Sequence, residues 1–358
     1  MRIDAKRLSK RLAAVFMAGV LAVGMIGVTA FADEKKPDPI DSITITKHVT
    51  TDGKTYAPNT SFKFTVATAD GGTYKGEVVK AGVTGGLYFA SGKDSIKYDP
   101  GDPESGFFNK LSDYYIEETE LSVNADKFTE TGIYHYTLTE TKGTYEGITY
   151  DTKPRDVYVY VYQDDTTKDY YVGGVIVVNG SEKSGVFTND YGYTKDTTHD
   201  LTITKKVTGT MGDHNKEFVF NVKVTGATGE KYYVVVKSDS TVDGTAYTMT
   251  SGTAAAYKIK DTGSIQIYGL TESDNVNVTE TDPGDGYIVT SSTTGTELTA
   301  NGKTVSGNVV ADATKATVTN DKGSTPTGLV FNYGPYVLMI ALAGAMAFFF
   351  LRRRNEEY

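Results

Sequence analysis

Apolar and polar residues alternate along most of the chain between positions 40 and 322. Successive side chains of a strand point to opposite faces, so such runs, rich in Val, Ile, Thr and Tyr, predict strands that bury one face. Breaks rich in Gly and Asp separate the runs, and no helical period occurs outside the two ends. The predicted strands are Ser42 to Thr50, Ser61 to Ala67, Gly132 to Glu140, Arg155 to Gln163, Tyr170 to Val178, Leu201 to Thr208, Glu217 to Thr225, Lys231 to Lys237, Ala256 to Leu270, Val276 to Glu280, Tyr287 to Ser291 and Thr314 to Asn320.

Short strands at these spacings predict an all-β fold of two tandem immunoglobulin-like β-sandwich domains. We expect the domains at residues 33–190 and 200–322, joined by a linker at 191–199 that is too short for free tumbling. The least regular stretch, Ala90 to Lys127, predicts a long surface excursion with a helical turn around Asn109 to Glu118.

Three short sequence motifs, called words below, each occur twice along the chain and in the same order: Ile-Thr-Lys, Thr-Glu-Thr and Thr-Asn-Asp. Stepping back in twos from the lysine, the glutamate or the asparagine reaches apolar residues; Lys47, for example, follows Ile43 and Ile45. An ammonium, a carboxyl and a carboxamide are therefore aimed at each core, where they are costly unless they satisfy or react with one another. The alternative is that each residue closes its strand at a wet rim, the usual fate of such side chains. The six residues are Lys47, Glu140 and Asn189 in the first set and Lys205, Glu280 and Asn320 in the second.

The two ends of the chain predict export and anchoring. Residues 1–32 combine a basic start, an apolar stretch and a small-residue cleavage site at Ala30-Phe31-Ala32, which is typical of a secretory signal peptide. An apolar span at 336–351 precedes three arginines, which predicts a transmembrane segment with its basic tail in the cytoplasm.

The segment before this span, Ser324-Thr325-Pro326-Thr327-Gly328, resembles a cell-wall sorting signal of Gram-positive surface proteins. The resemblance makes residues 323–358 a sorting signal and implies cleavage by a sortase between Thr327 and Gly328. The usual leucine-proline pair is absent, which favours a dedicated sortase over the housekeeping enzyme. The alternative is a one-span membrane protein in which Pro-Thr-Gly is only a linker.

Composition narrows the classes of function that remain for this chain. Removing the five basic and one acidic residues of the leader and the three basic and two acidic residues of the tail from totals of 36 and 45 leaves 28 against 42, a net charge of −14. This balance argues against nucleic-acid binding. The four histidines show no ligand spacing, and no phosphate loop or nucleophile elbow is present, so we expect no metal, no cofactor and no enzyme with turnover. The chain also has no cysteine, so an exported protein of this kind lacks disulfide reinforcement.

The chain resembles the two-domain backbone pilins of streptococcal type. The ordered Lys, Glu and Asn words carry this resemblance together with the sorting signal and the runs Tyr134 to Glu140, Gly147 to Asp151 and Val157 to Val161. It implies a spontaneous Lys–Asn isopeptide bond in each domain, promoted by the glutamate: Lys47 with Asn189 through Glu140, and Lys205 with Asn320 through Glu280. Burial supports this chemistry, because it favours a neutral amine and a protonated carboxyl that polarises the amide carbonyl.

The resemblance further implies a pilus shaft displayed outside the cell and attached to the cell wall. Its partners are a pilus-specific sortase, further copies of the chain and minor pilins. The family places an acceptor lysine just upstream of the first-domain asparagine, and Lys183 is the nearest match, with Lys168 and Lys195 as fallbacks. A minor pilin or wall-anchored adhesin that binds host matrix, and an enzyme on a surface scaffold, remain as alternatives.

Overall fold

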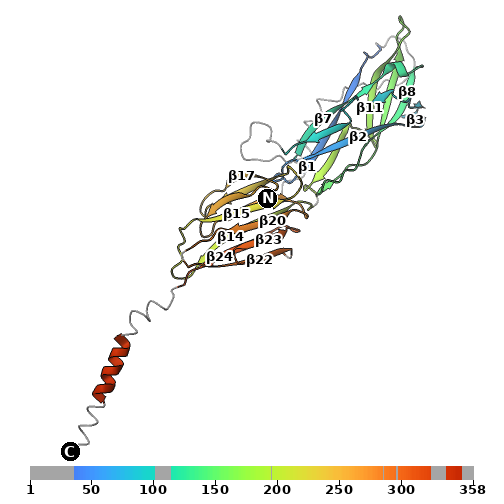
Figure 1. Cartoon of the computed structure of the whole chain (residues 1–358). Coiled ribbons are helices and arrows are strands. Elements are labelled where there is room, and N and C mark those ends of the chain that lie inside the picture. The colour runs from blue at the N-terminus through green and yellow to red at the C-terminus, as the bar shows by residue number, and fades with distance from the viewer. Residues whose placement is uncertain are drawn as a thin grey trace, which may run out of the picture.

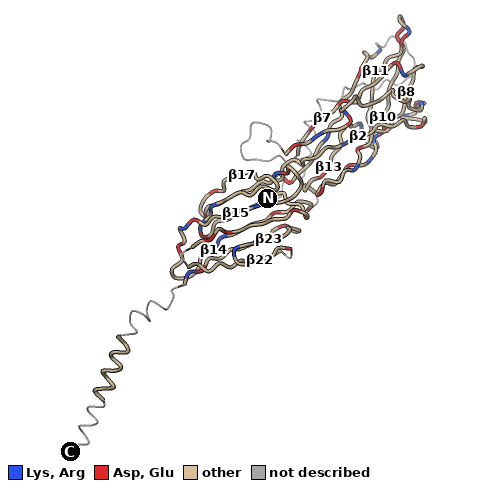
Figure 2. Tube along the Cα trace, viewed as in Figure 1, with Lys and Arg blue, Asp and Glu red and all other residues tan. Residues whose placement is uncertain are grey.

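The computed structural model describes residues 36–100, 114–194, 196–284, 286–295, 297–323 and 336–348. Two β-sandwiches follow one another along an elongated molecule (Figure 1). Acidic and basic residues are distributed along both of them (Figure 2), in keeping with a predominantly acidic surface. The predicted all-β architecture is confirmed in these residues.

The first sandwich consists of a five-stranded and an eight-stranded sheet. The five-stranded sheet has the order β5-β7-β1-β13-β9, with β5 Leu87–Tyr88, β7 Tyr114–Val123, β1 Ser42–Thr51, β13 Val186–Tyr191 and β9 Ile148–Thr149. The other sheet runs β12-β11-β10-β8-β2-β6, with β12 Glu182–Lys183, β11 Tyr170–Asn179, β10 Arg155–Gln163, β8 Gly132–Glu140, β2 Thr60–Thr68 and β6 Ser95–Tyr98. The hairpin of β3 Gly72–Tyr74 and β4 Glu77–Ala81 pairs with β8.

The second sandwich has a six-stranded and a five-stranded sheet. The order β17-β16-β19-β14-β24-β21 joins Thr245–Thr250, Lys231–Lys237, Ser264–Leu270, His199–Thr208, Thr314–Asp321 and Ile288–Thr293. The order β18-β15-β20-β23-β22 joins Ala255–Ile259, Phe218–Thr225, Asn275–Glu280, Thr304–Asn308 and Leu298–Asn301.

Both cores follow from the alternation in the sequence. In β10, Val157, Val159 and Val161 point into the first core, while Tyr160 and Tyr162 point outward. In β14, Leu201, Ile203 and Val207 lie in the second core. The buried faces of the two sheets pack on each other and exclude water from the space between them.

In each sandwich the first and last long strands are parallel neighbours, β1 with β13 and β14 with β24. A parallel pair cannot be joined by a tight turn, so nearly the whole sandwich forms the connection between its two strands. This topology brings residues more than a hundred positions apart to adjacent strands.

Two predicted elements are wrong. Within Ala90 to Lys127, β7 is a full strand that pairs with β1 and buries Leu121, so Tyr114 to Glu118 is strand rather than a helical turn. Exposed glutamates interrupt the apolar alternation of β7, so the sequence did not predict this strand. The predicted strand Ala256 to Leu270 is two strands, β18 and β19, which lie in different sheets and are separated by a turn containing Gly263.

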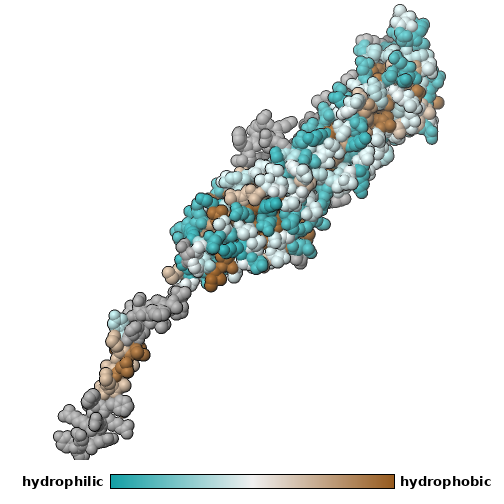
Figure 3. All heavy atoms as spheres, viewed as in Figure 1, coloured by the Kyte–Doolittle hydropathy of each residue, from teal (hydrophilic) through white to brown (hydrophobic). Residues whose placement is uncertain are grey.

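The predicted signal peptide at 1–32, the cleavage site Thr327-Gly328 and the basic tail lie outside the described residues. A helix covers 336–348 of the predicted span 336–351 and is apolar in Figure 3. No helix in the described part of the chain is long and apolar enough to cross a membrane.

Polar side chains join the two sandwiches. Glu230, directly before β16 of the second sandwich, accepts hydrogen bonds at 3.1 Å from the hydroxyls of Tyr145 and Tyr191 of the first. Its other oxygen accepts from Tyr232 at 2.8 Å. Asp274 is buried beside this group, and burial followed by repulsion from Glu230 raises its pKa to about 7.

The buried Asp274 carboxyl predicts a pH-dependent stability. Between its ordinary pKa of 3.8 and about 7, the folded state binds more protons than the unfolded state, so the free energy of unfolding falls as pH rises through this window. At pH values above 7, we expect Asp274→Asn to raise the thermal midpoint of the second sandwich. Near pH 4 the substitution should have little effect. Calorimetry across this range tests the expectation, and a difference that does not change with pH would contradict it.

Candidate functional site: a buried Lys–Glu–Asn cluster in each sandwich

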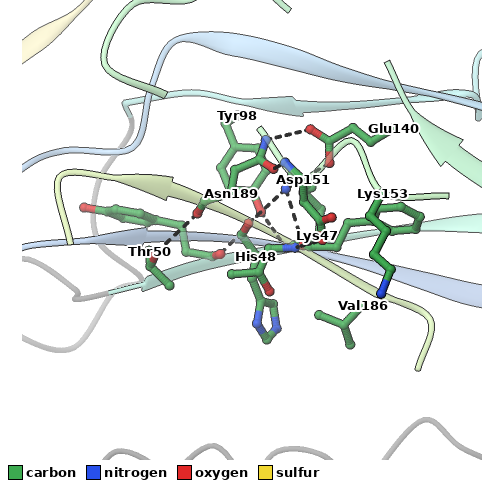
Figure 4. Close-up of polar contacts among 12 residues, drawn as sticks. Lys47, His48, Thr50, Tyr98, Glu140, Asp151, Lys153, Val186 and Asn189 are labelled. Carbon is green, nitrogen blue, oxygen red and sulfur yellow. Dashed lines mark hydrogen bonds and ion pairs between the residues drawn. The ribbon is translucent and has the colours of Figure 1, made fainter. Parts of the chain in front are cut away.

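The first cluster joins three strands of the first sandwich (Figure 4). Lys47 comes from β1 and Asn189 from the parallel neighbour β13, whereas Glu140 reaches across the core from β8 of the other sheet. The three side chains are 0%, 0% and 1% exposed. Because all three residues face the core and are buried, the wet-rim alternative does not hold.

Short polar contacts connect the three groups. Lys47 Nζ lies 3.1 Å from Glu140 Oε2, and Asn189 Nδ2 donates to Glu140 Oε1 at 2.6 Å. The lysine also donates to the carbonyl oxygens of His48 and Phe187 at 3.1 and 3.3 Å. Glu140 is therefore the bridge between the amine and the carboxamide.

The second cluster repeats this arrangement. Lys205 Nζ lies 3.3 Å from Glu280 Oε1, and Asn320 Nδ2 donates to the same oxygen at 2.6 Å. The side chains are 0%, 1% and 0% exposed. The structure thus brings together all six residues that the sequence singled out, three in each core.

Strand register is the same in both clusters. Lys47 is aligned with Phe187 and Lys205 with Val318, so each asparagine lies two positions beyond the residue opposite the lysine. Residues two apart share a face, and the diagonal neighbour on the next strand is within reach of a long side chain.

Aromatic rings line both clusters, and the sequence analysis missed them. Phe62 and Phe218 lie under the lysines, with Nζ at 4.8 and 4.4 Å from the ring centroids. Phe64 and Phe220 are aligned with Glu140 and Glu280 across the neighbouring strand. A fourth repeated word, Phe-x-Phe at 62–64 and 218–220, is the signal that would have found them.

The apolar surroundings shift both titrations toward neutral groups. Burial lowers the pKa of Lys47 and of Lys205 to about 8, although the nearby glutamates oppose the shift. Burial also raises the pKa of Glu140 and Glu280, against the opposing effect of the lysines. Both changes favour a neutral amine, which is the nucleophilic form of lysine, beside a protonated carboxyl.

The orientation of the carboxamides differs from the expectation. A protonated glutamate was expected to polarise the amide carbonyl, but in both clusters the glutamate contacts the amide nitrogen. The oxygen of Asn189 instead accepts from the backbone N–H of Asp151 at 2.7 Å. Asp151 lies in a run that carried the family resemblance, but sequence reasoning assigned it no role.

The other predicted site residues are only partly described. Lys183, in β12, and Lys168, in the turn before β11, are both exposed. Lys195, Thr327 and Gly328 lie outside the described residues. Among the described residues, no three His, Asp or Glu side chains are grouped as metal ligands.

These features define a class of protein: a tandem of β-sandwiches, each with one buried ammonium–carboxyl–carboxamide cluster between its first and last long strands. Residues 43–192 match the FctA family, described as the Spy0128-like isopeptide containing domain. Residues 199–322 match a second family, a domain of unknown function, DUF7601.

Two curated proteins of Streptococcus pyogenes are similar in sequence. A pilin of serotype M1 is 25% identical over 342 residues, covering 87% of this chain and 91% of the pilin. The pilus tip adhesin Cpa is 32% identical over 125 residues, covering 35% of this chain and only 16% of the adhesin.

Solved structures share the fold. The crystal structure of the major pilin from S. pyogenes has a TM-score of 0.57 at 21% identity, covering 79% of this chain and 99% of that one. The major pilin T3.2 from S. pyogenes serotype GAS13637 has the same TM-score at 24% identity and covers 80% and 100%. Together with the sequence matches, these findings confirm the resemblance to streptococcal-type pilins.

The lowered lysine pKa predicts how stability depends on pH when no crosslink can form. In Asn189→Ala, the unfolded state binds more protons than the folded state between pH about 8 and 10.5, so the contribution of Lys47 to the free energy of unfolding rises with pH there. The matched control is Lys47→Met/Asn189→Ala, which keeps every other titratable group and lacks only the lysine. Denaturant unfolding should therefore show that Asn189→Ala, which keeps Lys47, gains stability relative to the double variant as pH rises through this window. A difference that stays constant with pH would contradict the lowered pKa of Lys47.

Proposed function

We propose that this protein is the structural subunit of a sortase-assembled covalent pilus shaft, stabilised by one autocatalytic Lys–Asn isopeptide bond in each sandwich. The observation that carries the proposal is the duplicated buried cluster, which joins the first and last long strands with the same register in both sandwiches. Similarity to a pilin over 87% of the chain supports the assignment.

The cluster geometry supports a single condensation per sandwich. The neutral lysine Nζ attacks Cγ of the asparagine, the new Nζ–Cγ bond forms, and Nδ2 leaves as ammonia after gaining the proton that the lysine loses. The glutamate contacts both nitrogens and can relay this proton. Unactivated amides are poor electrophiles, but fixed reactants reach effective molarities on the order of 10⁵ M or more. The reaction occurs once in each sandwich, so the protein is not an enzyme with turnover.

Such bonds would carry mechanical load. Because β1 and β13 are parallel neighbours, a Lys47–Asn189 bond transmits tension between them without shearing the sheet hydrogen bonds. The Lys205–Asn320 bond would do the same between β14 and β24. By the loop-entropy relation used for disulfides, closing a loop of this length adds roughly 5 kcal/mol to stability.

The assembly step requires a donor and an acceptor. A pilus-specific sortase would cut after Thr327 and transfer its carbonyl to Lys183 of the next subunit, giving an extracellular head-to-tail polymer attached to minor pilins or the cell wall. Exposure of Lys183 on the short edge strand β12 supports it as the acceptor, and Lys168 is an exposed second candidate. The domain limits expected from the sequence, 33–190 and 200–322, are also part of this proposal.

The crosslinks predict a mass defect. Each condensation expels one ammonia, so intact mass spectrometry of the recombinant protein should give a mass two ammonia molecules below that of the sequence. Glu140→Ala and Glu280→Ala should each restore one, because each removes the proton relay of one cluster. A wild-type mass equal to that of the uncrosslinked sequence would sink the isopeptide assignment.

A pilus-presented adhesin is the second candidate. The 125-residue similarity to a pilus tip adhesin favours it, although this segment spans only 16% of that protein. A terminal adhesin needs a donor carbonyl but no acceptor lysine, so the two candidates differ in what one lysine does.

Pilus assembly distinguishes a shaft subunit from a pilus-presented adhesin. Lys183→Ala should abolish the boiling-resistant ladder of oligomers on gels of native cell-wall extracts and leave secretion and both internal bonds unchanged, because an exposed lysine contributes little to folding. Lys168→Ala, at the second candidate, should leave the ladder intact, and loss of the ladder in that variant alone would move the acceptor to Lys168. A ladder that needs neither Lys183, Lys168 nor Lys195 would reject the acceptor assignment, and a host that never forms one would favour the adhesin.

A further inference from the structure

The two clusters differ at the carbonyl oxygen of the asparagine. Asn189 Oδ1 accepts a 2.7 Å hydrogen bond from the backbone N–H of Asp151. Asn320 Oδ1 is buried and has no hydrogen-bond partner among the described residues. A buried carbonyl without a donor is costly, so the contrast is a physical difference between two otherwise matching sites.

A backbone N–H can donate but cannot accept, and this fixes the first carboxamide in one orientation. Its oxygen must face Asp151, which leaves Nδ2 to face Glu140. In the second cluster no backbone donor within the described part of the chain selects between the two orientations of the Asn320 amide.

A buried arginine holds Asp151 in place. The Arg155 side chain is 1% exposed, and its Nη2 donates to Asp151 Oδ2 at 2.5 Å. The same guanidinium donates to the carbonyl oxygen of Lys153 at 2.7 Å and stacks 4.5 Å from the Phe187 ring centroid. Asp151 Oδ2 also accepts from the backbone N–H of Thr188, next to Asn189 in β13. The segment that carries the N–H is thereby fixed to the strand that carries the asparagine.

We propose that the Asp151 backbone N–H is an oxyanion donor for the first condensation, with Arg155 as its positioning residue, and that the second sandwich condenses without such a donor. The inference deepens the proposed function and rests on its crosslinking chemistry. When Lys47 Nζ attacks Cγ, negative charge develops on Oδ1, and a fixed donor at hydrogen-bond distance stabilises that charge more than it stabilises the starting amide.

The hydrogen bond from Asp151 to Asn189 gives separate roles to the backbone N–H and to Glu140. Because Asp151 polarises the carbonyl oxygen, the protonated Glu140 is free to give its proton to Nδ2, which leaves as ammonia, and to take up the proton that Nζ loses. In the second sandwich Glu280 contacts both nitrogens, and none of the described backbone N–H groups assists it at the oxygen.

The test follows both condensations in the same full-length chain. Cell-free synthesis is pulse-labelled and quenched in acidic denaturant at intervals, and crosslinked and free peptides of each sandwich are quantified by mass spectrometry after proteolysis. The key variant carries the α-hydroxy analogue of aspartate at position 151, which replaces only the N–H by an ester oxygen. We expect it to slow the Lys47–Asn189 bond by about 100-fold, the typical cost of losing one oxyanion donor. The Lys205–Asn320 bond should form at the wild-type rate and is the internal control.

Two further variants separate the donor from its support. Asp151→Asn keeps the N–H and the side-chain shape and should slow the first bond much less than the ester does. Arg155→Met keeps the length of the side chain but removes its hydrogen bonds; it should slow the first bond alone, and Arg155→Lys should restore part of the rate. Circular dichroism of the completed chains verifies that each variant folds.

The outcomes are distinct. An ester variant that crosslinks its first sandwich at the wild-type rate overturns the role of Asp151 and leaves the proposed function intact. Equal slowing of both bonds also overturns it, because the effect would then be one of folding. A wild-type chain that loses no ammonia from either sandwich overturns the crosslinks themselves.

Discussion

An ammonium, a carboxyl and a carboxamide share each apolar core, and the cost of burying them constrains the rest of the sandwich. Removing such groups from water costs several kcal/mol per ion unless partners replace the lost hydration. In both cores the partners are close: the glutamate contacts the lysine and the asparagine, and phenylalanine rings lie under the ammonium. Since two strands of one sheet and one strand of the other supply these groups, the cluster fixes how the sheets sit on each other.

Topology determines what such a cluster can accomplish. Pairing the first and last long strands in parallel puts the lysine and the asparagine on neighbouring strands, although the chain between them forms almost the whole sandwich. The proposed covalent link at this point would close a loop that contains almost the whole sandwich. In a chain without cysteine, the proposed bond would supply the kind of covalent reinforcement that disulfides give to secreted domains.

The duplication is close in register but not in detail. Both clusters have the same strand alignment and the same Phe-x-Phe pair. Among the described residues, however, a backbone donor on the carboxamide oxygen and a buried arginine that holds it occur in the first cluster alone. The sandwiches also differ in sheet size and meet through tyrosine hydroxyls directed at Glu230. The surroundings of the two clusters therefore differ, whereas the lysine, the glutamate and the asparagine are the same in both.

The sequence determined the all-β class, the two sandwiches, and the face on which each of the six polar residues lies. These features depend on local alternation, because residues two apart in a strand share a face whatever the partner strand. Alternation fails where the outward residues are strongly charged, as in β7, or where a turn inside an apolar run sends the chain to the other sheet, as between β18 and β19. Only the tertiary structure decided which strands are neighbours, that the glutamate faces the amide nitrogen, and that the N–H of Asp151 reaches Asn189. Those contacts join residues about 40 to 140 positions apart, and no pattern along the chain encodes the distance between two atoms that meet only after the sheets have packed.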